Sequence, residues 1–263
     1  NTAVGLRALD LTTTTSDNTA VGYYALRANT GASNVAVGKD ALTANTTGGS
    51  NVAIGYRALK DNTTVSQMTA VGTGALQNNT TGDENVAVGY HALTANTTGS
   101  GSVAVGWEAG KAVTTGDYMV LMGRRAGYSL TTADSNVAIG NAALAAETTG
   151  EKNTAIGRSA LDTQDGAANN VAIGYYAGEA ITTGSNNTAV GTYALDANTT
   201  GANNVAIGLH ALGGNTTASS NTAIGYEALK VNTTGDESVA IGAYCGDANT
   251  TGSDNVAIGV YTF

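Results

Sequence analysis

The chain has 263 residues and a formal net charge of −9, it lacks Pro, and only 12% of its residues are charged. The longest basic run is Arg124–Arg125, so we expect no nucleic-acid partner, and no apolar run approaches the roughly 20 residues needed to insert into a membrane. Apolar residues make up 42% and recur in register, which is unlike a disordered chain.

A repeat of about 17 residues covers the whole chain, with the consensus N-[TV]-A-[VI]-G-x-x-A-L-x-A-N-T-T-G-x-x. Fourteen of the fifteen intervals are 17 residues long and one is 16. Such a period predicts a solenoid, in which each copy is one coil. We expect a single repeat domain over 1–263 with sixteen coils, the last incomplete, and a piece of a longer fibre. Position one of each coil is Asn1, Asn18, Asn34, Asn51, Met68, Asn85, Ser102, Met119, Asn136, Asn153, Asn170, Asn187, Asn204, Asn221, Ser238 or Asn255.

Within each coil the first expected element is a strand at positions two to four, such as residues 2–4. The Gly at position five, present in all sixteen copies, and the later Thr-Thr-Gly indicate turns, so each coil should supply about two short strands. A Gly that recurs at one position predicts either a positive φ or a close approach of another backbone. The sequence therefore predicts an all-β fold, a parallel β-solenoid or β-roll.

Both faces of this first strand are apolar. We expect the Val or Ile at position four to fill the coil together with Ala at position eight and Leu at position nine. The Ala at position three, for example Ala172 or Ala206, would then face outward against a second sheet of the same kind. This arrangement predicts an oligomer of parallel solenoids, most simply about a three-fold axis.

Positions nine and twelve are expected to share one interior volume. Leu at position nine is replaced by Gly110, Gly127 and Gly178 in three coils, and position twelve of the same coils becomes Val113, Leu130 and Ile181. Loss of one side chain would be offset by gain of the other, as close packing requires. The fifteenth coil, with Gly246 and Asn249, does not follow this pattern.

Aromatic side chains gather at positions six and seven, which hold ten of the twelve Tyr residues and the single Trp. Rings along an exposed edge can stack on sugars and would form a surface for a glycan or protein receptor. The alternative is a stack of rings that only shields a corner of the coil. The candidate receptor-binding residues are Tyr23, Tyr24, Tyr56, Tyr90, Trp107, Arg124, Arg125, Tyr175, Tyr176, Tyr193, Tyr226 and Tyr244.

The eighth coil departs furthest from the consensus. It carries Met119, Leu121 and Met122 in its first four positions and Arg124–Arg125 at positions six and seven. Such an irregularity marks either a recognition patch or a bend in a degenerate repeat.

No catalytic or metal-binding pattern accompanies the repeat. His91 and His210 lie seven coils apart with no nucleophile or ligand spacing beside them. Cys245 occupies a position that other coils give to Ala, where we expect an inert buried thiol. We therefore expect a protein that is not an enzyme and that holds no metal or cofactor.

Polar side chains of two kinds, Thr and Asn, are expected to form columns along the solenoid. Thr-Thr occupies positions thirteen and fourteen in thirteen of the fifteen complete coils, which suggests an ice-binding array. Adjacent residues of a strand face opposite ways, however, so a flat double rank of hydroxyls is not specified. The Asn residues at positions one and twelve should form amide ladders from coil to coil.

The opening pentad resembles the repeats of trimeric autotransporter adhesin heads. The longer unit over 187–201 is similar to repeats of phage tail-fibre proteins and related bacterial trimeric fibres. The resemblance implies a left-handed roll, an intertwined or side-by-side homotrimer, and a location outside the cell, on a cell surface or a virion. The chain departs from the adhesin-head pattern in the length of its coil.

The function expected from this resemblance is that of a structural and adhesive fibre segment, which extends a shaft and binds surface receptors. Two alternatives stay open, a passive spacer whose recognition domain lies elsewhere and an ice-binding solenoid. A fold can be shared by proteins with unrelated partners, so the resemblance specifies architecture better than function.

Overall fold

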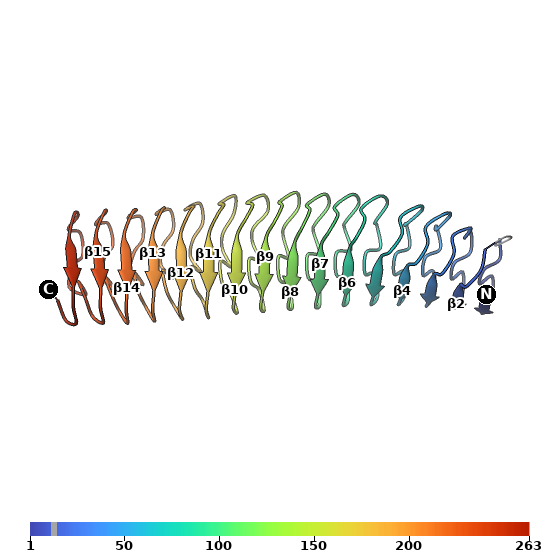
Figure 1. Ribbon diagram of the computed structural model, residues 1–263, viewed down its shortest axis with the longest axis horizontal. Coiled ribbons are helices and arrows are strands. Elements are labelled where there is room, and N and C mark those ends of the chain that lie inside the picture. Colours follow the sequence, from blue (N-terminus) through green and yellow to red (C-terminus); the bar gives the residue numbers. More distant parts are fainter. Residues whose placement is uncertain (12–14, 263) are drawn as a thin grey trace. The chain divides into compact units, whose positions relative to one another are not determined.

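The computed structural model describes residues 1–11 and 15–262, and the Thr13–Thr14 pair of the first coil lies outside them. These residues form two compact units, Asn1–Ser135 and Asn136–Phe263. Each unit is a parallel β-solenoid with one three-residue strand per coil, and no helix occurs in the described ranges (Figure 1). The all-β solenoid with coils of about 17 residues is therefore confirmed.

The strands of each unit pair in parallel and in register. Ala189 pairs with Ala206, and Ala206 pairs with Ala223, so equivalent positions of successive coils lie side by side. The first unit contains β1 (Thr2–Val4), β2 (Thr19–Val21), β3 (Val35–Val37), β4 (Val52–Ile54), β5 (Thr69–Val71), β6 (Val86–Val88), β7 (Val103–Val105) and β8 (Val120–Met122). The second contains β9 (Val137–Ile139), β10 (Thr154–Ile156), β11 (Val171–Ile173), β12 (Thr188–Val190), β13 (Val205–Ile207), β14 (Thr222–Ile224), β15 (Val239–Ile241) and β16 (Val256–Ile258).

The expectation of two strands per coil is wrong, because the segment after the strand alternates in backbone conformation. Residues at positions seven and nine have positive φ, as in Tyr193 (54°) and Leu195 (55°), which no strand can accommodate. Coil-to-coil hydrogen bonds continue through this segment nevertheless. The Leu195 amide donates to the Ala211 carbonyl (3.0 Å), and the Thr199 amide donates to the Thr216 carbonyl (2.7 Å).

The expected assignment of the two strand faces is also wrong. Ala at position three is inside the coil: Ala172 and Ala206 are fully buried, while Ile173 and Ile207 at position four are each 38% exposed. The interior is lined by Ala at positions three and eight and by Leu at position nine. The narrow interior explains the difference, because it is shared with the Leu side chains at position nine and leaves little volume for a residue larger than Ala.

The Gly at position five has a positive φ in every coil, between 125° and 144°, as the sequence predicted. A second constraint acts on the same residue. A Cβ on Gly38, for example, would lie 2.5 Å from the carbonyl oxygen of Gly55 in the next coil. A side chain at this position would therefore strain the backbone and break the contact between coils.

The shared volume of positions nine and twelve is confirmed, and Leu121 completes it. A Cβ on Gly178 would lie 3.0 Å from Cδ1 of Ile181, and a Cβ on Gly127 would lie 2.6 Å from Cδ1 of Leu130. Leu121, fully buried at position three, extends its two methyl groups toward the spaces above Gly110 and Gly127. Leu121 in the eighth coil thus compensates for the side chains that Gly110 and Gly127 lack.

The Asn ladders are confirmed as the polar part of the interior. The Asn221 amide donates to Oδ1 of Asn204 (3.0 Å), and Nδ2 of Asn204 donates to the Ala218 carbonyl (2.9 Å). At position twelve, Nδ2 of Asn215 donates to Oδ1 of Asn198 (3.0 Å). These buried side chains satisfy the backbone groups of the turns, which would otherwise lie unpaired in the interior.

The inward position of Ala predicts that two substitutions destabilise the fold for opposite reasons, one by overfilling the interior and the other by emptying it. Ala206→Leu places a large side chain beside Leu195 and Leu212 and should lower the free energy of unfolding by about 1–3 kcal/mol. Leu121→Ala empties the space between Gly110 and Gly127 and should cost about 3 kcal/mol. Urea unfolding followed by circular dichroism measures both. If neither substitution changes stability, the inward assignment of position three is wrong.

Candidate functional site

The aromatic edge comprises the side chains at positions six and seven, directly after the Gly at position five. Position six is largely exposed, as in Tyr56 (39%) and Tyr226 (41%), and position seven is half-buried in most coils. The edge therefore lies on the surface of each unit, where the sequence placed it. Its use by a receptor stays a prediction.

In the second unit the edge is a pile of rings. Tyr176 stacks on Tyr193 with ring centroids 5.6 Å apart, and Tyr193 stacks on His210 at 5.1 Å, with interplanar angles of 1° and 3°. Tyr175 meets Tyr176 and Tyr193 edge-on at 4.3 and 5.5 Å. The faces of these rings are covered by one another, so a sugar cannot stack on Tyr193 without displacing a neighbour.

A second pile in this unit joins Tyr226, Tyr244 and Tyr261. Tyr244 stacks on Tyr261 at 4.7 Å and meets Tyr226 edge-on at 5.0 Å. Hydrogen bonding to Tyr244 and then to Glu227 raises the pKa of Tyr226 to about 12, so its phenol is neutral at any physiological pH. His210 and Tyr261 were not among the predicted residues, although their positions in the coil would have identified them.

In the first unit the rings alternate with cations. Tyr23 and Tyr24 touch at 4.1 Å, and Lys39 separates Tyr23 from Tyr56, with its Nζ 5.8 Å from each ring centroid. Arg57 covers Tyr56 at 4.9 Å. Because a cation is attracted to the face of an aromatic ring, these contacts fix the rings in place.

Coils six to eight bring together Tyr90, Trp107 and the two arginines. Tyr90 stacks on Trp107 at 6.0 Å with an interplanar angle of 11°. The guanidinium carbons of Arg124 and Arg125 lie 5.0 and 5.1 Å from the Trp107 ring. The predicted residues Trp107, Arg124 and Arg125 thus form one cluster.

Beneath this cluster lies Glu108, a carboxylate only 5% exposed. Its Oε1 accepts a bond from Nζ of Lys111 (2.6 Å), and its Oε2 accepts one from Nε of Arg125 (3.2 Å). Burial by itself would raise the pKa of Glu108, but the bonds from Lys111 and Arg125 outweigh it and hold that pKa below its ordinary value. Glu108 therefore stays ionised and anchors both cations.

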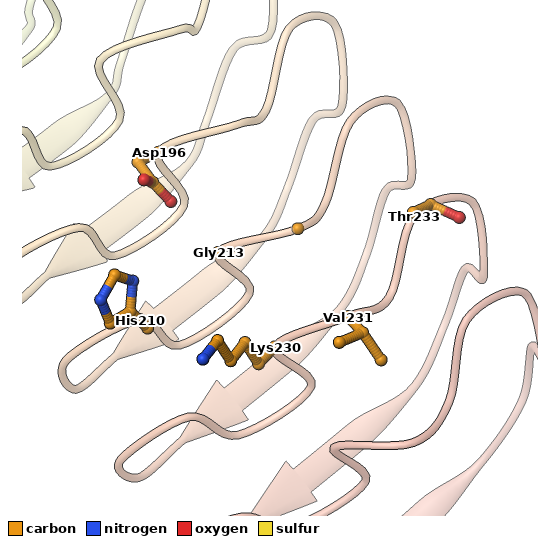
Figure 2. A pocket seen from close by; sticks show the side chains of 7 residues that line it. Asp196, His210, Gly213, Lys230, Val231 and Thr233 are labelled. Atoms are coloured by element: carbon orange, nitrogen blue, oxygen red, sulfur yellow. The ribbon is translucent and has the colours of Figure 1, made fainter.

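A shallow depression of about 410 Å³ opens in the second unit at coil thirteen (Figure 2). Gly213 and Gly214 stand at positions ten and eleven, where most coils carry larger side chains. Asp196, His210 and Lys230 border the space, and Lys230 pairs with Glu227 (3.0 Å). The depression offers both hydrogen-bond donors and acceptors to a small polar molecule.

A column of carboxyl groups runs beside this depression at position ten, formed by Asp162, Glu179 and Asp196. Burial raises the pKa of all three, and the charges of Asp162 and Asp196 raise that of Glu179 further. A like charge on a neighbouring coil destabilises the ionised form.

Glu147 is a buried carboxylate that sequence reasoning missed. It replaces Asn at position twelve, and its Oε1 accepts hydrogen bonds from the amides of Gly150 (2.6 Å) and Gly166 (2.8 Å). Nε2 of Gln164 donates to its Oε2 (2.9 Å). Glu147 thus takes over the role of the ladder amide and has no oxygen available to a ligand.

The described ranges lack the groups that other kinds of site would need. They contain no group of three or more His, Cys, Asp or Glu residues arranged to hold a metal ion, and no helix that could span a membrane. Cys245 is fully buried in the interior, as expected. Neither protein-family profiles nor curated protein sequences give a match to this chain.

The carboxyl column predicts a pH-dependent effect of Glu179→Gln. A raised pKa means that the folded state holds the proton more tightly than the unfolded chain does. The protonated Glu179 therefore contributes fully to stability below the pKa that this group has in the unfolded chain. That contribution is lost as the pH rises through the higher pKa of the folded chain. At pH 7 the Gln variant should be more stable by about 0.3 kcal/mol, a small gain because solvent screens the charges.

Urea unfolding at pH 7 and at pH 3.5, roughly a unit below an ordinary Glu pKa, tests this expectation. Glu151→Gln, at an exposed turn of the same unit, is the control and should have no effect at either pH. An equal gain from Glu179→Gln at both pH values would exclude charge repulsion as the cause.

Proposed function

We propose that this chain is a segment of a homotrimeric fibre, on a cell surface or a virion, with a structural and adhesive role and no catalytic one. The observation that carries the proposal is the outer strip, the side chains at positions two and four that leave the sheet on its outer face. In the second unit position four is always Ile or Val, and position two is always Val or Thr.

The outer strip consists of Val, Ile and Thr side chains, with Met122 in the first unit, and carries no charged residue. Ile173, Ile207 and Ile241 are each 38% exposed in the single chain, and Met122 in the first unit is 41% exposed. Contiguous apolar surface of this kind marks an interface in soluble proteins. The strip therefore takes over the interface role that the sequence had assigned to Ala at position three.

A further copy of the same chain is the occupant that fits the strip best. The strip repeats once per coil, so a parallel copy in register presents a matching apolar pair at every level. If position two of one copy packs on position four of the next, the contact is heterologous, and a rotation of one third of a turn between copies closes it into a ring of three. A ring of three agrees with the resemblance to trimeric adhesin heads and tail fibres.

The adhesive part of the proposal rests on the aromatic edge and its cations, which lie outside the outer strip. The spacer alternative is favoured by the piled rings of the second unit, whose faces are covered. The ice-binding alternative is disfavoured by the Thr hydroxyls at position thirteen. Oγ1 of Thr199 donates to the Thr216 carbonyl (3.0 Å), and Oγ1 of Thr216 donates to the Thr233 carbonyl (3.2 Å).

Sedimentation equilibrium of the chain and two variants tests the trimer. Ile207→Asp would place one carboxylate per copy inside the interface, where a desolvated charge without a partner costs several kcal/mol, and should give monomers. Leu209→Asp is the matched control, because Leu209 is 37% exposed but lies on the aromatic edge. It should leave the trimer intact.

Circular dichroism would confirm that both variants keep the fold. A monomeric parent chain at micromolar concentration would refute the proposal, and so would equal dissociation by both variants. A dimer would keep the outer strip as an interface but reject the three-fold arrangement.

A further inference from the structure

We infer that the cluster of Trp107, Lys111, Arg124, Arg125 and Tyr128, here named the basic cluster, binds an anionic saccharide through its carboxylate, sulfate or phosphate groups. The inference deepens the adhesive part of the proposed function, on which it rests. It does not depend on the trimer, because every residue of the cluster belongs to one unit of one chain.

The basic cluster carries a local positive charge. The whole chain has 11 Lys and Arg residues against 20 Asp and Glu, yet three of those cations meet in coils seven and eight. Glu108, which is buried, contacts two of these cations, Lys111 and Arg125. Three cations around one anion leave a local positive charge on an acidic protein.

The guanidinium groups of Arg124 and Arg125 keep hydrogen-bond donors available. Within the described residues Arg124 forms no ion pair or hydrogen bond, although it is exposed. The Arg125 side chain is 44% exposed and pairs with Glu108 through Nε, and no ion pair or hydrogen bond within the described residues uses its terminal nitrogens. Both groups can therefore donate to an incoming anion, and guanidinium groups match the geometry of carboxylate, sulfate and phosphate oxygens.

The cations of the basic cluster are preorganised by aromatic rings. Trp107 holds Arg124 at 5.0 Å and Arg125 at 5.1 Å, and Tyr128 holds Arg125 at 5.0 Å and Lys111 at 5.5 Å. Two guanidinium groups over one ring repel each other, and an anion between them relieves that repulsion. Side chains that are already fixed lose less conformational entropy when a ligand binds.

Stacking of a sugar on Trp107 is not expected to be the main contact. One neighbour of the Trp107 ring is Tyr90 at 6.0 Å, and the arginines lie over the same ring system. The ring thus positions the cations, and charge rather than stacking is the basis of recognition. A neutral glycan should accordingly bind weakly or not at all.

Titration calorimetry with the intact chain tests the inference, using a sulfated heparin octasaccharide, a galacturonate oligomer and neutral dextran as probes. Binding of either acidic probe should weaken about tenfold in Arg124→Gln and should fall as salt is raised, since salt screens exposed charges. Because Arg124 is exposed and forms no ion pair or hydrogen bond with the described residues, losing its surface contact with Trp107 should change the melting temperature little.

Arg158→Gln is the matched control. Arg158 also stands at position six, is exposed, and covers Tyr175 at 5.7 Å and Tyr176 at 5.8 Å, but no second arginine lies beside it. Its loss should change affinity by less than twofold. Binding of only the sulfated or only the uronate probe would identify the source of the anion and support the inference.

The inference is overturned if neither acidic probe binds, if dextran binds as well as they do, or if Arg158→Gln weakens binding as much as Arg124→Gln. A trimer without acidic-saccharide binding would refute this site and leave the fibre role intact. Binding of an acidic saccharide by a chain that proves monomeric would support this site and refute the homotrimeric fibre.

Discussion

Within each unit, the in-register pairing of each coil with the next is the constraint on which the rest of the structure depends. Because Ala189, Ala206 and Ala223 lie side by side, every position in the coil becomes a column of like side chains within its unit. Interior columns must then consist of residues that tolerate their own kind at the spacing between strands, about 4.8 Å. Ala satisfies this by size, and Asn satisfies it because its amide both donates and accepts along the column.

The same constraint shows why the repeat predicted the solenoid but not the direction of its faces. Period, strand position, amide ladders and the exchange between positions nine and twelve all follow from counting residues. The face assignment failed because Val and Ile were expected inside on hydrophobicity alone. The deciding factor was the interior volume that remains beside Leu at position nine. That volume holds a small residue such as Ala206, and the larger Ile207 lies on the outer face. Leu121, the exception, lies where two neighbouring Gly residues free that volume.

Positive φ at position nine also had a signal in the sequence. Gly110, Gly127, Gly178 and Gly246 all stand at this position, and Leu takes the same conformation in other coils, for example Leu195. For the aromatic edge, the sequence located Tyr176, Tyr193 and Trp107 correctly. It could not show that the rings cover one another's faces, because stacking depends on side-chain orientation. The irregular eighth coil pointed to the basic cluster, but the pairing of Glu108 with Lys111 and Arg125 depends on side-chain orientation as well.

The most direct test of this account is thiol reactivity along β13 (Val205–Ile207). Single Cys residues would replace Val205, Ala206 and Ile207 in a Cys245→Ala background, which restores the residue that other coils carry at position eight. The account predicts that Cys at 206 reacts with a maleimide only when the coils unfold, at any protein concentration. Cys at 205 or 207 should react in the folded chain once dilution separates the copies. Reaction at 206 in the folded protein, with 205 and 207 protected at every dilution, would contradict it.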